Sequence, residues 1–503
     1  MEYSKTALEI IQDQTLTYHQ QLVELAKLGE STDNTIEMDP KYLDALHRNV
    51  ICDLNEGAAP YRPRYNCPDY ELLFEKGCEF LELNPPKDIW EATHTLLIFY
   101  HNNHTGSSYP CYLGNIDTLL EPFIKDEEEA RKAIRLFLLS IDKTLPDSFV
   151  HANIGPMETK AGHIILDLTE EMQLAVPNLT LKYNENITSD AFARHALKCM
   201  LKSSKPSFAN DEMFKKDLGE RYGIASCYNG FNITGGAYTM NRLRLSDCAK
   251  EATSIDDFMD RVLPYYSKLM IENMNRRIKF IVEESTFFKT NFLVKEGFLK
   301  QENFVGLYGL AGLAECCNTL LHIEDKNKGF GHNQEANELG VKILERIVEI
   351  SKSIYSPYSE NRNNRVWMHA QVGIDSDGQD CSPGTRIPVG AEPTLFEQIM
   401  HSTLYHKYFP TGTGDIYRFD ETWSNNLDAL LDLVKGGMRS GVRYFSGYEE
   451  GGNLVRVTGY LVKKSELEKL ERGEVSHNQA TVLGVGQKYN AKALTRKLHT
   501  MNE

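Results

Sequence analysis

Gly459 lies at a position where glycine is energetically unfavourable. It interrupts the apolar, strand-like run LVRVTGYLV at residues 454–462, and a glycine there adds no side chain to the packing and loses much backbone entropy on folding. Two interpretations compete. The first is a bulge or a close approach of another backbone segment. The second is chemical: because glycine has no Cβ, a Cα that has lost one hydrogen atom can become planar between two amide groups that share the unpaired electron.

The residues around Gly459 resemble a known signature. Arg456, Val457, Thr458, Gly459 and Tyr460 spell Arg-Val-x-Gly-Tyr, and a glycine-rich stretch containing GGMRSG and GYEEGGN precedes them. This pattern near the C-terminus resembles the glycyl radical motif. The leucine that follows makes it more similar to anaerobic ribonucleotide reductase than to pyruvate formate-lyase. The resemblance implies that Gly459 stores an unpaired electron.

Cys227 is the second residue whose type and setting suit such chemistry. It lies in the glycine-flanked segment GIASCYNG, residues 223–230. A stored radical needs a relay to its substrate, and a thiol S–H bond is weak enough to give up its hydrogen atom. That reaction needs a neutral, dry thiol rather than the thiolate of nucleophilic catalysis. Considered alone among ten cysteines, Cys227 would be a buried structural thiol.

The surroundings of Cys227 favour the relay. Ile-Ala-Ser-Cys resembles the Ile-Ala-Cys-Cys turn of the formate-lyases. The following residues 230–245, GFNITGGAYTMNRLRL, resemble the reductase stretch in which a strand with an Asn-Leu-Pro-type motif follows the cysteine loop. In that comparison Asn241 takes the place of an asparagine that contacts substrate, although Leu243 stands where the relatives have proline.

A third region, residues 306–318, reads GLYGLAGLAECCN. It resembles the Gly-x-x-Gly-x-x-Glu turn from strand to helix late in the reductase barrel, which makes Glu315 a candidate substrate-binding residue. The adjacent Cys316 and Cys317 are a rival to Cys227, since formate-lyases use two neighbouring cysteines. We expect core packing for this pair, because neighbours on a helix do not face the same way.

Two further segments carry polar groups. His104 and Cys111 lie in HNNHTGSSYPC, residues 101–111. They are expected either to line the cavity from an early strand, with Cys111 resembling a redox cysteine of the reductases, or to belong to a polar loop. Residues 411–415, TGTGD, either present backbone N–H groups to an anionic substrate or form a plain turn.

Together these motifs resemble the YjjI-type glycyl radical family, which is related to anaerobic (class III) ribonucleotide reductase and pyruvate formate-lyase. The resemblance extends from about residue 90 to the end. It implies an α/β fold: a ten-stranded barrel of two five-stranded halves, surrounded by helices, with the cysteine and glycine loops meeting inside. It also implies a separate radical S-adenosylmethionine activase with a 4Fe–4S cluster, which generates the glycyl radical on Gly459.

The resemblance leads to a mechanistic hypothesis. The Gly459 radical generates a Cys227 thiyl, which abstracts hydrogen from a small, unidentified substrate. Ribonucleotide reductase-like activity, formate C-acetyltransferase-like activity and a catalytically idle relative that acts as a binding protein are the alternatives. The chain departs from each relative: Ser226 replaces the second cysteine of the formate-lyases, Asn229 the glutamate of the eliminases, and no four-cysteine zinc site is present.

The pattern of the chain divides it into segments that would position these residues. We expect an N-terminal helical segment at 1–60, an α/β barrel with the cysteine loop at 61–435, and a C-terminal glycyl radical region at 436–503. Early apolar residues recur at spacings of three and four, which lines up one helical face: Leu8, Ile11, Thr15, Tyr18, Leu22 and Leu25. Helical patterns alternate with short apolar or β-rich runs, including GHIILDL, NLTLKY and GAYTMNRLRL, as in α/β proteins.

The amino-acid composition limits which partners the protein is expected to bind. A net charge of −16 disfavours nucleic acids and anionic membranes. The first residues, MEYSKTALEIIQDQ, do not read as a signal peptide, and no long apolar run predicts a membrane span, so a cytoplasmic protein is expected. The ten cysteines never fall into Cys-x-x-Cys spacing, so we expect no bound metal in this chain. A homodimer is the commonest expectation for its assembly.

Overall fold

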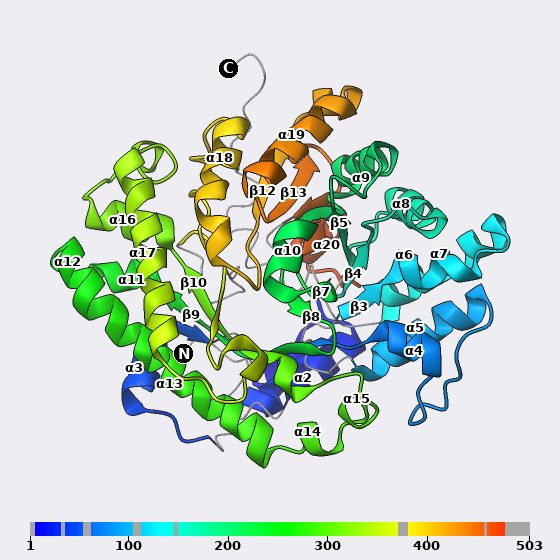
Figure 1. Cartoon of the computed structure of the whole chain (residues 1–503), viewed down its shortest axis with the longest axis horizontal. Coiled ribbons are helices and arrows are strands. Elements are labelled where there is room, and N and C mark those ends of the chain that lie inside the picture. Colours follow the sequence, from blue (N-terminus) through cyan, green and yellow to red (C-terminus); the bar gives the residue numbers. More distant parts are fainter. Residues whose placement is uncertain are drawn as a thin grey trace.

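The computed structural model describes residues 6–31, 36–53, 62–103, 112–144, 149–370, 381–456 and 460–477. Helices form an outer ring, and most of the strands lie inside it (Figure 1). Residues 222–232 also run inside the ring, below helix α10 (Asp211–Leu218) in this view.

One sheet has the strand order β12-β13-β6-β5-β4-β3. From β3 to β6 the neighbouring strands are parallel, as are β12 and β13, whereas β13 and β6 are antiparallel. Strand β5 is buried along its whole length, as expected for a parallel strand that is covered on both faces. The strands are β3 (Tyr112–Asn115), β4 (His151–Ile154), β5 (Asn178–Tyr183), β6 (Ser207–Asn210), β12 (Asp415–Phe419) and β13 (Tyr444–Glu449).

The second sheet is built on β9 and β10, which are parallel and fully buried. Strand β11 continues the parallel direction, while β1 and β2 pair with β9 in the antiparallel direction. The strands are β1 (Ile51–Asp53), β2 (Tyr65–Cys67), β9 (Gly235–Arg244), β10 (Phe304–Ala311) and β11 (Trp367–His369).

These strands divide into two halves along the chain, β2 to β6 and β9 to β13. The halves meet through antiparallel pairs at two seams, β6 with β13 and β2 with β9. The expected α/β fold, with sheets inside a ring of helices, is therefore confirmed; among the described residues the strands pair as one five-stranded and one six-stranded sheet, without a pairing of β2 with β3 or of β11 with β12.

The helices pack their apolar faces onto these strands, leaving charged faces outside. The longer ones are α2 (Tyr18–Ser31), α5 (Ile89–Asn103), α7 (Glu127–Thr144), α8 (Lys160–Met172), α9 (Asp190–Ser203), α13 (Leu263–Lys279), α17 (Gln334–Ser353), α18 (Leu395–Tyr405) and α19 (Leu427–Ser440). The shorter ones include α1 (Ala7–Gln12), α3 (Pro40–His47), α4 (Tyr70–Lys76), α6 (Ile116–Leu120), α11 (Leu245–Lys250), α16 (Leu313–Leu320) and α20 (Lys464–Glu471).

Two local expectations were wrong. The run GHIILDL is part of helix α8 rather than a strand: Thr159 caps the helix by accepting from the Gly162 N–H, and a short apolar run alone does not distinguish strand from helix. The N-terminal helix is interrupted, because Asp13 accepts from the backbone and side chain of Thr15 and ends the first helical segment. Four of the residues that were expected to line up on one helical face are exposed: Leu8, Ile11, Tyr18 and Leu22.

The expected segment boundaries do not coincide with breaks in the fold. Strand β1 lies within residues 1–60 and pairs with β9 of the barrel. The boundary at residue 436 falls inside α19, and β13 beyond it pairs with β6.

Candidate active site

Cys227 lies at the tip of a β-hairpin inside the ring. Strands β7 (Tyr222–Ile224) and β8 (Gly230–Asn232) pair antiparallel with Ile224 opposite Gly230. At the tip, the Ala225 N–H donates to the Asn229 carbonyl at 2.8 Å. We call residues 222–232 the cysteine hairpin. The expectation of a cysteine on a tight, glycine-flanked loop therefore holds in this geometry.

Both halves of the barrel hold the cysteine hairpin in place. Asn153 of β4 donates to the Ile224 carbonyl at 3.0 Å and accepts from the Ile224 N–H at 2.8 Å. On the other side, the Gly230 N–H donates to the Thr411 carbonyl at 2.9 Å. Gly412 has φ +122°, and a Cβ there would lie 2.0 Å from the Tyr228 carbonyl oxygen. The TGTGD segment thus packs against the hairpin backbone.

The thiol of Cys227 is protected from water. The residue is 5% exposed, and its Sγ lies 3.6 Å from the Ser226 Oγ. Burial raises the pKa of Cys227, while the Ser226 hydrogen bond and the guanidinium groups of Arg386 and Arg456 lower it by less. The neutral thiol therefore predominates at neutral pH, which is the form that can transfer a hydrogen atom.

A second hairpin brackets Gly459. Strands β14 (Leu454–Arg456) and β15 (Leu461–Lys463) pair antiparallel, with Arg456 opposite Leu461. Residues 457–460 connect the two strands in the sequence, and of these Val457, Thr458 and Gly459 lie outside the described residues. The run that looked like one strand is thus two short strands. We call residues 454–463 the glycine hairpin.

The two described ends of this tip are buried. Arg456 is 2% exposed, and its Nη2 donates to the Ser204 carbonyl at 2.6 Å. The Tyr460 ring meets Phe149 edge-on at a centroid distance of 5.5 Å. The buried Arg456 and Tyr460 therefore anchor the glycine hairpin on both sides of residues 457–459.

Tyr444 of β13 neighbours both hairpins. Its ring lies 5.9 Å from that of Tyr228, the residue after Cys227. Burial raises the pKa of Tyr444 to about 12, Arg456 lowers it and Cys227 raises it. The Tyr444 hydroxyl bonds to Thr180 Oγ1 at 2.6 Å. Tyr444 thus lies beside the cysteine hairpin and near enough to Arg456 for that guanidinium to lower its pKa.

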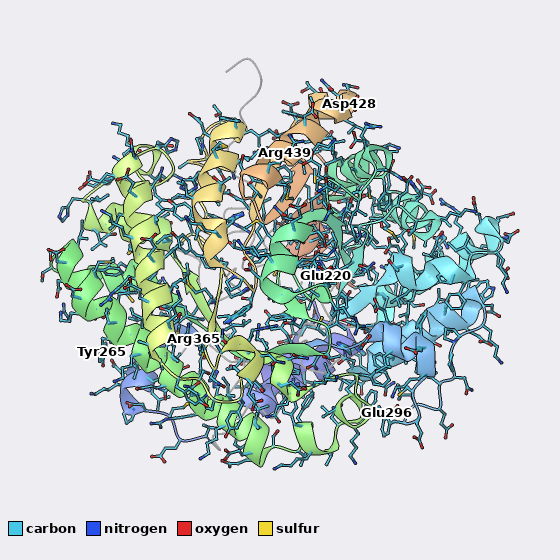
Figure 2. All side chains as sticks on the ribbon, in the orientation of Figure 1. Glu220, Tyr265, Glu296, Arg365, Asp428 and Arg439 are labelled. Carbon is cyan, nitrogen blue, oxygen red and sulfur yellow. The ribbon has the colours of Figure 1, made fainter. Side chains whose placement is uncertain are left out.

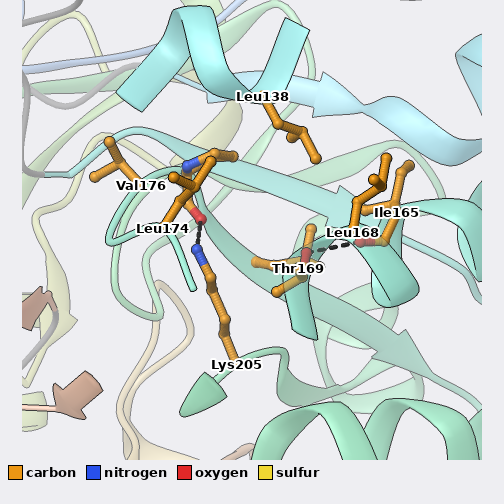
Figure 3. Close-up of a pocket in the computed structure, with 9 residues that line it drawn as sticks. Leu138, Ile165, Leu168, Thr169, Leu174, Val176 and Lys205 are labelled. Carbon is orange, nitrogen blue, oxygen red and sulfur yellow. Dashed lines mark hydrogen bonds between the residues drawn. The ribbon is translucent and has the colours of Figure 1, made fainter. Parts of the chain in front are cut away.

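Lys205 is a buried cation beside the glycine hairpin. Its Nζ donates to the Pro177 carbonyl at 2.7 Å, next to an apolar pocket that includes Leu138 and Val176 (Figure 3). Burial lowers the pKa of Lys205 to about 7. The preceding Ser204 accepts from Arg456 and also donates from Oγ to the Leu454 carbonyl at 2.9 Å. Residues 204–205 therefore support the glycine hairpin.

A larger cavity, of about 350 Å³, lies at the carboxyl ends of β3, β4 and β5. Lys182 in its wall donates to the Tyr222 carbonyl at 2.7 Å, at the start of the cysteine hairpin. Glu220, whose side chain is exposed, also lines it and is labelled near the centre of the view in Figure 2. This cavity adjoins the base of the hairpin, several residues from Cys227.

Asn241 is not brought to Cys227 by a contact in the described structure. Its Nδ2 donates to the Tyr42 hydroxyl of α3 at 2.7 Å. It pairs in register with Tyr308, whose hydroxyl lies 2.7 Å from Ser267 Oγ on α13. Residues paired across neighbouring strands share a face. Asn241 therefore points toward the helices, and the structure gives no support to a substrate contact there.

Glu315 lies after the expected turn from strand to helix. Gly312, with φ +73°, joins β10 to α16. The Glu315 carboxylate accepts from the backbone and hydroxyl of Ser382, at 3.0 and 2.7 Å. It thereby fixes the start of the segment that carries Arg386. These two hydrogen bonds indicate a positioning role for Glu315.

The remaining candidate residues are either buried in the core or outside the described residues. Cys316 and Cys317 are fully buried in the apolar core under α17, and burial raises the pKa of both thiols. His104 and Cys111 lie outside the described residues. Within the described part of the chain, no group of three or more His, Cys, Asp or Glu side chains is arranged to hold a metal ion. The helices of that part include none long and apolar enough to span a membrane.

Sequence reasoning missed several residues that meet the cysteine hairpin. Asn153 holds Ile224, and the rings of His369 and Tyr228 lie 5.7 Å apart. The Arg386 guanidinium lies 5.9 Å from the Tyr228 ring centroid. No local motif marks these residues, since each comes from a different strand or loop. Their strand-end or loop positions in an α/β protein were the only available signal.

Comparison with known proteins gives these hairpins a context. A family model described as "Glycyl radical enzyme YjjI-like" matches residues 16–499. The chain belongs to this glycyl radical enzyme family. An uncharacterized protein of Haemophilus influenzae is 45% identical over 501 residues, which is 98% of this chain and 96% of that protein. Uncharacterized protein YjjI of Escherichia coli is 39% identical over 459 residues, 90% of this chain and 88% of that protein.

Solved structures agree on the fold of this YjjI-like enzyme. An anaerobic ribonucleotide reductase superposes with a TM-score of 0.69 at 14% identity, covering 86% of this chain and 81% of that one. Hydroxyproline dehydratase from Clostridioides difficile gives 0.70 at 12% identity, covering 99% and 89%. These TM-scores show that the chain shares the fold of these proteins, as expected.

Proposed function

We propose that Gly459 stores the radical of this YjjI-like enzyme and that Cys227 relays it to a small-molecule substrate. The observation that carries the proposal is the position of Cys227. Its buried, neutral thiol sits at a hairpin tip close enough to Arg456 for that guanidinium to lower its pKa. Arg456 is the last described residue before the tip that contains Gly459.

The proposed steps balance without an external oxidant or reductant. The Gly459 Cα radical takes a hydrogen atom from the Cys227 S–H, forming a Cα–H bond and a thiyl. The thiyl takes a hydrogen atom from a substrate C–H bond and becomes a thiol again. After the substrate radical has reacted, it recovers that hydrogen atom from Cys227, and the thiyl regains one from Gly459. One unpaired electron is present throughout.

The described residues support these hydrogen-atom transfers by keeping water away from the thiol and by holding Cys227 in position. Asn153 and Gly412 fix the hairpin backbone on either side of Cys227, because small displacements are costly in a transfer between two specific atoms. The seclusion of the thiol prevents side reactions of the radical with water. Gly459, exposed to oxygen in the radical state, is expected to suffer backbone cleavage.

A partner must make the radical. Glycyl radical enzymes are generally activated by a radical S-adenosylmethionine enzyme, and we propose such an activase, with a 4Fe–4S cluster, as the partner of this chain. We further propose a cytoplasmic homodimer that binds neither nucleic acid nor membrane, in keeping with its net charge of −16.

The test needs no substrate. The purified chain is activated anaerobically and its electron paramagnetic resonance spectrum recorded, first in H₂O and then in D₂O. A glycyl radical carries one remaining Cα hydrogen, which splits its signal into a doublet. If Cys227 exchanges hydrogen with Gly459, its S–D group introduces deuterium at the Cα and the doublet collapses in D₂O.

Two variants identify the relay. Cys227→Ser should keep the doublet and block its collapse, because an O–H bond is too strong to donate to the glycyl radical. Cys78→Ser is the matched control: Cys78 is also buried, and its Sγ bonds to Glu296 Oε1 at 3.5 Å, a contact that serine retains. Collapse at the wild-type rate in Cys227→Ser would refute the relay. Absence of any doublet with a demonstrably active activase would favour the idle, binding relative.

A further inference from the structure

The cavity of about 350 Å³ at the carboxyl ends of β3, β4 and β5 has no part in the proposed hydrogen-atom transfers. Asn115, Gly155 and Lys182 bring the ends of the three strands into its wall. The crevice outside the carboxyl ends of parallel strands is where α/β sheets usually bind ligands, and small-molecule sites have volumes of about 300–1,000 Å³. The place and the size of this cavity are therefore those of a binding site.

Much of the cavity wall is aromatic or aliphatic. The rings of Tyr70 and Tyr112 meet edge-on in it at a centroid distance of 6.0 Å. Met157 and Ile187, which are 60% and 45% exposed, lie where the cavity opens to solvent. Further apolar contacts come from Leu119 and Ile233. Such a wall favours a ligand with an aromatic body.

Lys182 places a buried ammonium group in this wall. The residue is 9% exposed, and its Nζ donates to the Tyr222 carbonyl at 2.7 Å and lies 4.6 Å from the centroid of the Tyr222 ring. Among the residues that the structure describes, no carboxylate oxygen lies within 4.0 Å of this Nζ. A buried ammonium group without an ion pair is unfavourable, and burial lowers the pKa of Lys182 to about 8.

Arg221, a second cation of the wall, differs from Lys182 in being paired. Its Nη2 donates to Asp69 Oδ1 at 2.7 Å and to Glu71 Oε2 at 2.8 Å. The charge of Arg221 is therefore offset within the chain. These two ion pairs also occupy two of the carboxylates that line the cavity.

Three carboxylates act on Lys182 from beyond 4.0 Å: Asp211, Asp117 and Glu71 raise its pKa, but by less than burial lowers it. Each has a closer partner than Lys182. Asp211 Oδ2 lies 3.0 Å from Lys215 Nζ, and Asp117 Oδ2 accepts from a backbone N–H at 2.8 Å. The chain thus leaves the ammonium group of Lys182 without a close counter-anion of its own.

We propose that this cavity binds a small organic carboxylate with an aromatic body, whose carboxylate pairs with Lys182 while its ring packs against Tyr70 and Tyr112. An ammonium group has three N–H donors, and one of those on Lys182 goes to the Tyr222 carbonyl, which leaves two for the ligand. A hydrogen bond between two charged groups in a secluded wall is a strong one. Tyr222 begins the cysteine hairpin, so the ligand would bind to the residue that holds the base of that hairpin. The site does not depend on the proposed role of Cys227.

The experiment uses the whole, unactivated chain and three probes with the same aromatic body and a different head group: 3-phenylpropionate, 3-phenylpropanamide and 3-phenylpropylamine. Binding is measured at pH 7 by calorimetry and by the shift of the melting temperature at constant ionic strength. We expect saturable binding of 3-phenylpropionate with one site per chain. The neutral amide should bind about 10- to 100-fold more weakly, the usual loss for hydrogen bonds between charged groups, and the amine should not bind.

Variants locate the site. Lys182→Met should weaken the binding of 3-phenylpropionate about 10- to 100-fold and leave that of the amide nearly unchanged. Lys205→Met is the matched control, because Lys205 is also buried and also donates to a backbone carbonyl, that of Pro177, but does not line the cavity. The affinity of Lys205→Met for 3-phenylpropionate should equal that of the wild type.

A second pair of variants keeps Lys182 in place. Ile187→Asp adds a negative charge where the cavity opens, so it should weaken the binding of 3-phenylpropionate more than that of the amide. Ile98→Asp is its control, since Ile98 is similarly exposed, at 41%, but lies on α5 outside the cavity. If Lys182→Met does not fold, this pair decides the location of the site.

The pH dependence gives an independent readout. With a pKa of about 8, Lys182 is mostly protonated at pH 7 and mostly neutral at pH 9, so the affinity for 3-phenylpropionate should fall about 10-fold between these values. The Cys67 thiol, whose pKa burial raises, stays neutral over this range, and Asp117, whose pKa burial raises to about 6, stays ionised. The affinity for the amide should not change with pH.

Three results would overturn the inference: no saturable binding of 3-phenylpropionate, equal affinities for the acid and the amide, or wild-type affinity for the acid in Lys182→Met. Where Lys182→Met does not fold, equal affinities of Ile187→Asp and Ile98→Asp for the acid would do the same. Since these measurements need no radical, their outcome is independent of the glycyl doublet and of its collapse in D₂O, which test the proposed function.

Discussion

Gly412 provides the sharpest test of how the cysteine hairpin is positioned. Its φ of +122° is a backbone conformation that residues with a Cβ rarely adopt, and a Cβ there would lie 2.0 Å from the Tyr228 carbonyl oxygen and 2.9 Å from its carbonyl carbon. Gly412→Ala must therefore push the backbone of residue 228, or of residue 412, by about 1 Å to reach an ordinary contact.

The magnitude follows from two contributions. Forcing a residue with a Cβ into this backbone region costs about 1–3 kcal/mol, and overpacking a buried contact costs about 1–3 kcal/mol. We expect Gly412→Ala to lose roughly 2–6 kcal/mol of unfolding free energy. The control is Gly436→Ala on α19, where nothing lies within 4 Å of the new Cβ. That substitution should stabilise by about 0.5–1 kcal/mol, because alanine loses less backbone entropy in a helix.

Three measurements check this expectation: urea unfolding, the intensity of the glycyl doublet, and the rate of its collapse in D₂O. The doublet should form normally in Gly412→Ala, because the glycine hairpin is anchored separately by Ser204 and Phe149. The collapse should slow by about 100-fold, the typical cost of a 1 Å misplacement of a reacting group.

A wild-type rate of collapse together with wild-type stability would refute the positioning argument. If Gly412→Ala does not fold, Gly414→Ala gives a milder test. Its Cβ would lie 3.0 Å from Tyr444 Cδ1 and 3.2 Å from Tyr228 Cδ1. It should slow the collapse by less than Gly412→Ala, and an unchanged rate there would contradict the same reasoning.

Three further predictions follow from single residues. Burial lowers the pKa of Lys205 from 10.5 to about 7, so the unfolded chain binds more protons between these values and the stability rises with pH. From pH 7 to 9 the unfolding free energy of the wild type should increase by about 2 kcal/mol relative to that of Lys205→Met in urea unfolding. A constant difference would contradict the burial of the cation. Gly309→Ala should cost about 1–3 kcal/mol of stability, because the new Cβ would lie 2.4 Å from Arg242 Cγ; wild-type stability in urea unfolding would contradict this close packing. Asn241→Ala should cost about 1–3 kcal/mol of stability through the lost bond to Tyr42, with a normal rate of collapse in D₂O; a blocked collapse would restore Asn241 to the active site.

Much of the fold was predictable because its signals are local. The runs NLTLKY and GAYTMNRLRL are rich in β-branched and aromatic residues, and they form β5 and β9. The amphipathic pattern of residues 334–353 forms α17. Where the local signal was short, it misled: GHIILDL spans only about two helical turns, and the N-terminal cap at Thr159, rather than the composition of the run, marks it as part of helix α8.

The sequence by itself determined the family, because the motifs around Gly459 and Cys227 are short segments that are recognised by the identity and order of their residues. Their catalytic roles remain predictions. The tertiary structure decided which side chains surround Cys227. Strands β9 and β10 are buried on both faces, so their sequences contain no polar alternation to say which face is inside. A shift of one residue reverses the face, and that difference turns Asn241 toward Tyr42 and the neighbouring Arg242 to the opposite face of the sheet. The approach of Arg386 and His369 to Tyr228 depends on contacts between distant segments, which no local pattern records.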